Sequence, residues 1–149
     1  MIRSKFDSRE HGLYDTYGRE SAKKIVERYG YTLEDNPDTY GIDFLLYKNG
    51  VHVGYADAEV RPNAWWDGDP IYPTIHAIKK KVETYSELDL PAWYFSISGC
   101  GKYMLMCKFK DMLSCPLIEV PNTREAYGES FYDVPVSMWK KLTIKENHE

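Results

Sequence analysis

The spacing of apolar residues divides the chain into helices, strands and loops. Ala22, Ile25, Val26 and Tyr29 recur at intervals of three and four residues, which predicts a helix over residues 15–29. Short runs rich in β-branched and aromatic residues predict strands at 31–33, 42–48, 51–61, 93–98 and 103–109. Helix-like apolar spacing predicts further helical segments at 75–87, 111–115 and 136–142. This order predicts an α/β fold with a central mixed sheet flanked by helices.

Two of these strands form the clearest local motif. Residues 42–48 and 51–61 are separated by an Asn-Gly sequence, which is typical of a tight hairpin turn. Residues 62–73, rich in Asp, Gly and Trp, are predicted to be a surface loop, and residues 1–13 an irregular N-terminal segment. We find no internal repeat and no linker, so residues 1–149 are interpreted as one domain.

Composition narrows the class of protein. No apolar run approaches the length of about 18 residues that a membrane span needs, and the first residues lack the apolar core of a signal peptide. The odd number of cysteines, three, favours free thiols in the cytoplasm over a disulfide framework. A net charge of −4 argues against a general nucleic-acid coat protein. It does not argue against a nuclease, because a local patch governs phosphate binding.

The hairpin carries an unusual set of charges. Asp43 opens the first strand, and Asp57, Glu59 and Arg61 alternate along the second. Because strand side chains alternate between faces, these three share one face, opposite a face of small apolar residues. Any single acid here has an ordinary explanation as a solvent-facing residue. Together they repel one another unless a cation lies between them, which favours a divalent-metal site.

A helix followed by Asp at one strand start and Glu-x-Lys at the next strand end resembles the PD-(D/E)XK nucleases. That family includes restriction endonucleases, Holliday junction resolvases and small phage nucleases. The segments 36–43 and 57–60, and Tyr72-Pro73-Thr74-Ile75-His76 leading into a basic run, are similar to the phage branch in particular. The resemblance covers residues 15–110 and implies a restriction-endonuclease-like fold.

The resemblance implies a metal-dependent endonuclease that hydrolyses DNA phosphodiester bonds. In the family, the two acids and the carbonyl after the second acid bind Mg²⁺ or Mn²⁺. Carried over, the metal ligands are Asp43, Glu59 and the carbonyl of Val60, with Asp57 as a further acid. The implied partner is duplex or branched DNA, bound by a homodimer without any membrane, in the cytoplasm of a bacterial host if the gene is phage-encoded.

The chain departs from the family pattern at Arg61, which stands where the family has lysine. Arginine cannot act as a general base, although it binds phosphate well. Three interpretations follow. Arg61 binds phosphate while the metal activates water; or the lysine has moved to the next helix, with Lys79 or Lys80 in the run 79–81 facing the acids; or the site binds without cleaving. The second is favoured here.

The family often adds an acid from the first helix. Glu20 is the candidate, although it lies nearly opposite the apolar face of the predicted helix, and Asp15 competes with it.

Other residues and functions remain open. His76 is a candidate proton carrier or phosphate donor, and packing is the competing explanation. Trp65 and Trp66 stand in a polar loop where both cannot be buried, so one is available to stack on a base. The alternative functions are a catalytically inactive nuclease-fold protein that binds nucleic acid, and a phage protein–protein interaction module that uses these tryptophans.

Overall fold

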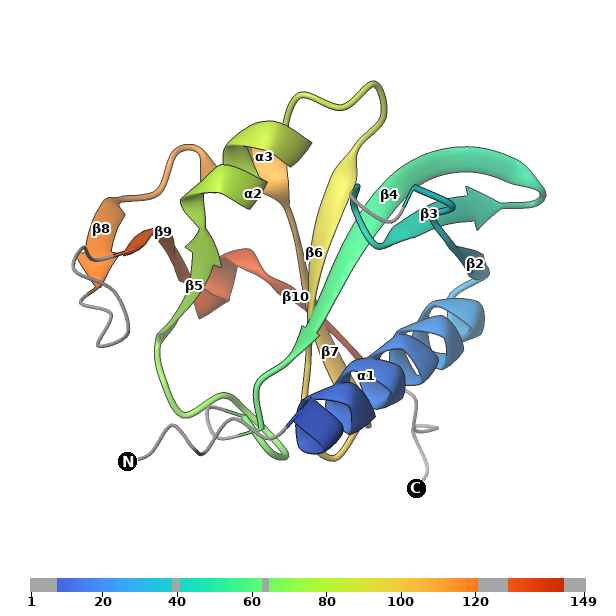
Figure 1. Cartoon of the computed structure of the whole chain (residues 1–149), viewed down its shortest axis with the longest axis horizontal. Helices are drawn as coiled ribbons and strands as arrows, with labels where there is room; N and C mark the ends of the chain where they lie inside the picture. The colour runs from blue at the N-terminus through green and yellow to red at the C-terminus, as the bar shows by residue number, and fades with distance from the viewer. Residues whose placement is uncertain (1–7, 39–40, 63–64, 121–128, 144–149) are drawn as a thin grey trace.

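A six-stranded mixed sheet forms the centre of the molecule, and a smaller three-stranded sheet packs beside it (Figure 1). The computed structural model describes residues 8–38, 41–62, 65–120 and 129–143. In chain order the elements are α1 (Ser8–Arg28), β2 (Tyr31–Asp35), β3 (Phe44–Lys48), β4 (Val51–Val60), β5 (Thr74–Ile78), α2 (Lys79–Tyr85), β6 (Ala92–Ile97), β7 (Tyr103–Lys108), α3 (Phe109–Met112), β8 (Leu117–Val120), β9 (Glu129–Pro135), the 3₁₀ helix η1 (Val136–Met138) and β10 (Lys140–Thr143).

The strand order of the central sheet is β10-β7-β6-β4-β3-β2. Strands β2, β3 and β4 form an antiparallel meander, and β4 then pairs in parallel with β6. A parallel pair needs a crossover connection, and here β5 and α2 lie within it. The smaller sheet, β5-β9-β8, is antiparallel.

The two faces of the central sheet carry two separate cores. Helix α1 covers one face, where Ala22, Ile25 and Val26 pack against strand residues that include Phe44 and Ala56. Helices α2 and α3 and the smaller sheet cover the other face, with a second cluster that includes Val82 and Tyr94. β4 therefore presents its small apolar residues to α1 and its acidic residues to the side of α2.

The predicted hairpin and the strands at β2, β6 and β7 are confirmed to within a few residues, as is the mixed α/β sheet. Three predictions were wrong. Helix α1 begins at Ser8, within the segment predicted to be irregular. Residues 74–78 form strand β5 before α2 begins, and the predicted helix at 136–142 is η1 followed by strand β10. Strands β8 and β9 were not predicted. Within the described ranges, we find no helix that is both long and apolar enough to cross a membrane.

The close approach of β4 to the segment before β6 requires glycine at position 54. A Cβ added to Gly54 would lie 2.6 Å from the backbone oxygen of Pro91, to which Tyr55 N–H donates at 2.9 Å. We expect Gly54→Ala to lower the free energy of unfolding by about 2–3 kcal/mol, because backbone atoms cannot rotate away from the new methyl group. Urea denaturation measures this, with Val51→Ala as the control, since Val51 is 60% exposed on the same strand. Equal stability of Gly54→Ala and the wild type would contradict the expected clash.

Candidate functional site

The hairpin ladder stops halfway along β4 and leaves an open edge. Strand β3 begins at Phe44, which pairs with Ala56, so residues 57–60 of β4 pair with β6 on one side and have no β3 partner on the other. Among the described residues, Asp43 is the first to lie beyond the end of this ladder. An open strand edge exposes backbone N–H and C=O groups that need other partners.

Two carboxylates fill this edge, and we call Asp43 and Asp57 the carboxylate pair. The backbone N–H of Asp43 donates to Oδ1 of Asp57 at 3.4 Å, and the N–H of Ala58 donates to Oδ2 of Asp43 at 3.2 Å. Asp57 is only 2% exposed. The side chains thus replace the missing ladder bonds, and they bring two like charges together.

This proximity changes the ionisation of Asp43. Burial, followed by repulsion from Asp57, raises the pKa of Asp43 to about 6, although a hydrogen bond from Ala58 and the charge of Arg19 act in the opposite direction. Arg19, on α1, donates to Oδ1 of Asp43 at 3.4 Å. Placing a second negative charge on the carboxylate pair therefore costs free energy.

Lys81 provides the main positive charge on the α2 side. Its Nζ lies 2.8 Å from Oδ2 of Asp57. Burial opposes the charge of Lys81, but attraction to Asp57, Glu59 and Asp43 outweighs it and raises the pKa of the ammonium. Lys81 therefore stays protonated at neutral pH, and acts as a hydrogen-bond donor and a positive charge rather than as a base.

Glu59 belongs to a neighbouring network. Its Oε1 accepts a short hydrogen bond from the hydroxyl of Tyr94 and an ion pair from Arg61 at 3.0 Å. Arg61 also donates to the Tyr94 oxygen at 3.0 Å and to the backbone oxygen of His76 at 3.1 Å. Burial raises the pKa of Glu59, but Arg61 and Tyr94 more than compensate and lower it. Glu59 is consequently ionised and its charge is already matched.

The structure brings together some of the residues expected from the sequence, and not others. Asp43 meets Asp57, while Glu59 is engaged by Arg61 and Tyr94. Lys79 pairs with Glu83 on its own helix at 3.0 Å, and Lys80 is exposed, so Lys81 is the lysine of this run that reaches the acids.

The remaining predicted residues also shift in role. Glu20 is exposed on α1, and its neighbour Arg19 is the residue that reaches Asp43. The side chain of Asp15 lies outside the described residues. The N–H of Ala58 faces the open edge, where it donates to Asp43, and the C=O of a strand residue points to the same side as its N–H. The carbonyls of Ala58 and of the alternate residue Val60 therefore both face this edge. Ala58 is the one that directly follows Asp57.

The donor set fits a hard divalent cation. Two carboxylates and the Ala58 carbonyl offer oxygen ligands, and Mg²⁺ accepts one or two carboxylates while keeping several waters. In the described part of the chain, no three His, Cys, Asp or Glu side chains converge into a metal-binding group. The acids that a metal would use are therefore the carboxylate pair, not a triad.

Comparisons with protein-family models, with curated proteins and with solved structures find no match for this chain. The geometry of the site is therefore the basis for the function proposed below.

Asp43 should give the stability of the protein a distinct pH dependence. The carboxyl releases its proton at a pKa of about 6 when folded and near 3.8 when unfolded. Between these two pKa values, the Asp43 carboxyl is ionised in the unfolded chain but still largely protonated in the native state. The free energy of unfolding therefore falls as pH rises through this range, and it stays at the lower value above about pH 6. The Asp43 side chain is 29% exposed, so solvent screens part of this effect.

In EDTA at pH 7, we expect Asp43→Asn to be more stable than the wild type by about 1–2 kcal/mol, and the difference to vanish near pH 4. Urea denaturation across this pH range measures the difference. A constant difference, or one that grows toward low pH, would show that Asp43 is not held in a repulsive environment.

Proposed function

We propose that this protein hydrolyses phosphodiester bonds of DNA with Mg²⁺ or Mn²⁺, and that it is a restriction-endonuclease-like nuclease. The carboxylate pair at the open edge of β4 carries the proposal. Even with Arg19 and Lys81 in contact with the pair, the pKa of Asp43 is raised to about 6, and asparagine at position 43 would accept the same backbone hydrogen bond without this electrostatic cost. The negative charges are therefore best explained by a cationic ligand.

The arrangement of elements supports the same proposal. A helix precedes a hairpin, an acid stands where one strand of that hairpin begins, and further acids lie on the next strand. These are the features that link the sequence to the PD-(D/E)XK nucleases. Relative to the sequence-based assignment, the proposed ligands move two residues along β4, from Glu59 and Val60 to Asp57 and Ala58.

Each group has a definite part in the proposed reaction. Asp43, Asp57 and the Ala58 carbonyl would hold the metal, which when bound would polarise the phosphate and activate water. Lys81 keeps its proton on Nζ and would donate it in a hydrogen bond to a phosphate oxygen. Arg61, fixed by Glu59 and Tyr94, would hold a neighbouring phosphate. Cleavage of both strands would take two such sites, so a homodimer is part of the proposal.

Each acid of the site is paired with a cation, and this favours a second candidate function, namely a protein that binds nucleic acid without cutting it. Arg19 and Lys81 contact the carboxylate pair, and Arg61 contacts Glu59, so each of these acids has a cationic partner, with Arg19 shared between Asp43 and Asp35. Such a cluster can persist without metal. In that case divalent ions would neither stabilise the protein nor be needed for DNA binding.

A cleavage assay on the wild-type protein tests the proposal. Supercoiled plasmid, linear duplex, single-stranded and four-way-junction DNA are each incubated with Mg²⁺, Mn²⁺, Ca²⁺ or EDTA. We expect cleavage with Mg²⁺ or Mn²⁺ and none in EDTA, together with a rise in melting temperature on metal addition. DNA binding without cleavage, and with no metal-induced stabilisation, would support the second candidate instead.

A further inference from the structure

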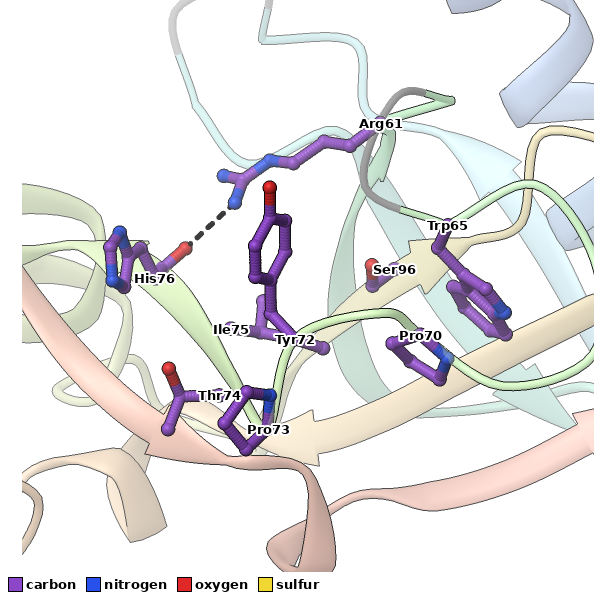
Figure 2. A pocket seen from close by; sticks show the side chains of 9 residues that line it. All are labelled: Arg61, Trp65, Pro70, Tyr72, Pro73, Thr74, Ile75, His76 and Ser96. Carbon is purple, nitrogen blue, oxygen red and sulfur yellow. Dashed lines mark hydrogen bonds between the residues drawn. The ribbon is translucent and has the colours of Figure 1, made fainter.

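A cavity of about 320 Å³ is lined by Arg61, and neither acid of the carboxylate pair is among its lining residues. Figure 2 shows the residues that line it. Its walls come from the loop that follows β4 and from strand β5, with one residue of β6. They are Arg61, Trp65, Pro70, Tyr72, Pro73, Thr74, Ile75, His76 and Ser96.

Flat, apolar surfaces dominate this cavity. Trp65 is 3% exposed, and its indole N–H donates to the Gly68 oxygen at 3.0 Å, which fixes the ring. Tyr72 is 59% exposed, and in Figure 2 its hydroxyl points toward the Arg61 guanidinium. Aromatic and proline faces stack well on a planar ring, whatever the identity of that ring.

Arg61 links the cavity to Glu59 on β4. One guanidinium nitrogen donates to the backbone oxygen of His76, and the other contacts Glu59. These bonds fix the guanidinium at the cavity wall, and a guanidinium carries more N–H donors than they use. The cavity thus combines a planar apolar interior with a fixed positive group suited to a phosphate.

We propose that this cavity binds one unstacked nucleotide of the DNA strand, with its base against the exposed ring of Tyr72 and its phosphate at Arg61. The inference rests on the proposed function and names its substrate class. Asp57 and Arg61 are separated by about 13 Å of strand, so DNA bound at the carboxylate pair can reach the cavity. The volume is at the small end for ligand pockets and suits a single nucleotide rather than a base pair.

The proposal predicts a preference for single-stranded, branched or distorted DNA over a fully paired duplex. Extracting a base from a paired stack costs free energy, which an already unpaired base avoids. Binding is measured with oligonucleotides that carry 2-aminopurine at successive positions, in Ca²⁺ or in EDTA. Single-stranded and fully paired versions of one sequence are compared.

We expect one 2-aminopurine position to change its fluorescence on binding, and Tyr72→Ala to abolish that change. Tyr72→Ala should also weaken single-strand binding about tenfold and leave duplex binding within about twofold. Tyr72→Phe keeps the ring and should behave like the wild type. The control is Ile71→Ala, since Ile71 is 67% exposed on the same loop and does not line the cavity.

The outcomes separate this inference from the proposed function. A position-specific signal that needs Tyr72, in a protein that cleaves no DNA, would support the nucleotide site and contradict the nuclease. Metal-dependent cleavage with the same strand preference in Tyr72→Ala and wild type would support the nuclease and overturn the nucleotide site. A fluorescence change that is uniform along the strand would also overturn it.

Discussion

In the proposed nuclease, Asp57→Asn is expected to lower metal-dependent DNA cleavage about 10³-fold or more, a loss of about 4 kcal/mol of transition-state stabilisation. Asparagine retains the oxygen that accepts from the N–H of Asp43, so the open edge of β4 keeps its hydrogen bond. It removes the charge that a divalent cation needs. Asp57 is 2% exposed, and solvent has little access to replace the missing ligand. Initial cleavage rates over a range of Mg²⁺ concentrations measure the effect.

A matched control separates charge at the site from charge in general. Glu119→Gln removes the same charge from an exposed position on β8, in the smaller sheet, and should cleave like the wild type. Melting temperatures in EDTA establish that both variants are folded. Metal should raise the melting temperature of the wild type and of Glu119→Gln, but not that of Asp57→Asn. Full cleavage by folded Asp57→Asn would refute the assignment of the metal to the carboxylate pair.

Local sequence signals were sufficient to predict the centre of this fold. The Asn-Gly turn fixes the hairpin of β3 and β4, and Asn49 and Gly50 both adopt the positive φ that such a turn requires. The helical spacing of Ala22, Ile25 and Val26 correctly predicts the buried face of α1, whereas Tyr29, the fourth residue of that pattern, follows the helix and is exposed. Both features depend on residues close together in the sequence, which is why periodicity reveals them.

The elements that were wrongly predicted to be helical are strands that form by pairing with another strand far away in the sequence. In residues 75–87 the apolar spacing is close to helical, yet β5 forms there because it pairs with β9, more than 50 residues later in the chain. β10 similarly forms on the edge of β7, where only Leu142 of its four residues is buried. A pattern within one segment carries no information about a partner this distant.

At the candidate site, too, local sequence signals predict one part and tertiary pairing decides the rest. The sequence was enough to identify Asp43 and the acidic face of β4, because alternation places Asp57 and Glu59 together. It was not enough to decide which of the two meets Asp43, since that depends on the residue at which the hairpin ladder ends. The family pattern favoured Glu59, but the ladder ends at the pair of Phe44 with Ala56, and this places Asp57 beside Asp43.

The choice among the three lysines depended on the same kind of information. Successive helix residues point in directions about 100° apart, so only one residue of the run 79–81 can face the acids. Its identity depends on where α2 begins. With β5 occupying residues 74–78, α2 begins at Lys79 and directs Lys81 toward Asp57. A helix starting at residue 75, as predicted, would leave this orientation undetermined.

In the proposed nuclease, Lys81→Met is expected to lower the cleavage rate about 10²-fold with little change in the DNA concentration needed for half-maximal rate. Methionine keeps an unbranched apolar stem of similar length and removes the ammonium that lies 2.8 Å from Asp57. Lys79→Met is the matched control on the same helix, because Lys79 pairs with Glu83 rather than with the acids. It should change the rate by less than about twofold. Single-turnover cleavage with saturating Mg²⁺ measures both variants.

The affinity for metal distinguishes a lysine that stabilises charge on the phosphate from one that only holds the structure together. In the metal-free protein, the Lys81 ammonium forms an ion pair with Asp57 and is also attracted to the negative charges of Glu59 and Asp43. Without Lys81 the carboxylate pair is more negative, so Mn²⁺ should bind Lys81→Met at least as tightly as it binds the wild type. Stronger metal binding combined with slower cleavage is the result expected of a lysine that stabilises charge on the phosphate. If Lys81 only held the structure together, its loss would instead weaken metal binding and lower the melting temperature, with cleavage falling in proportion.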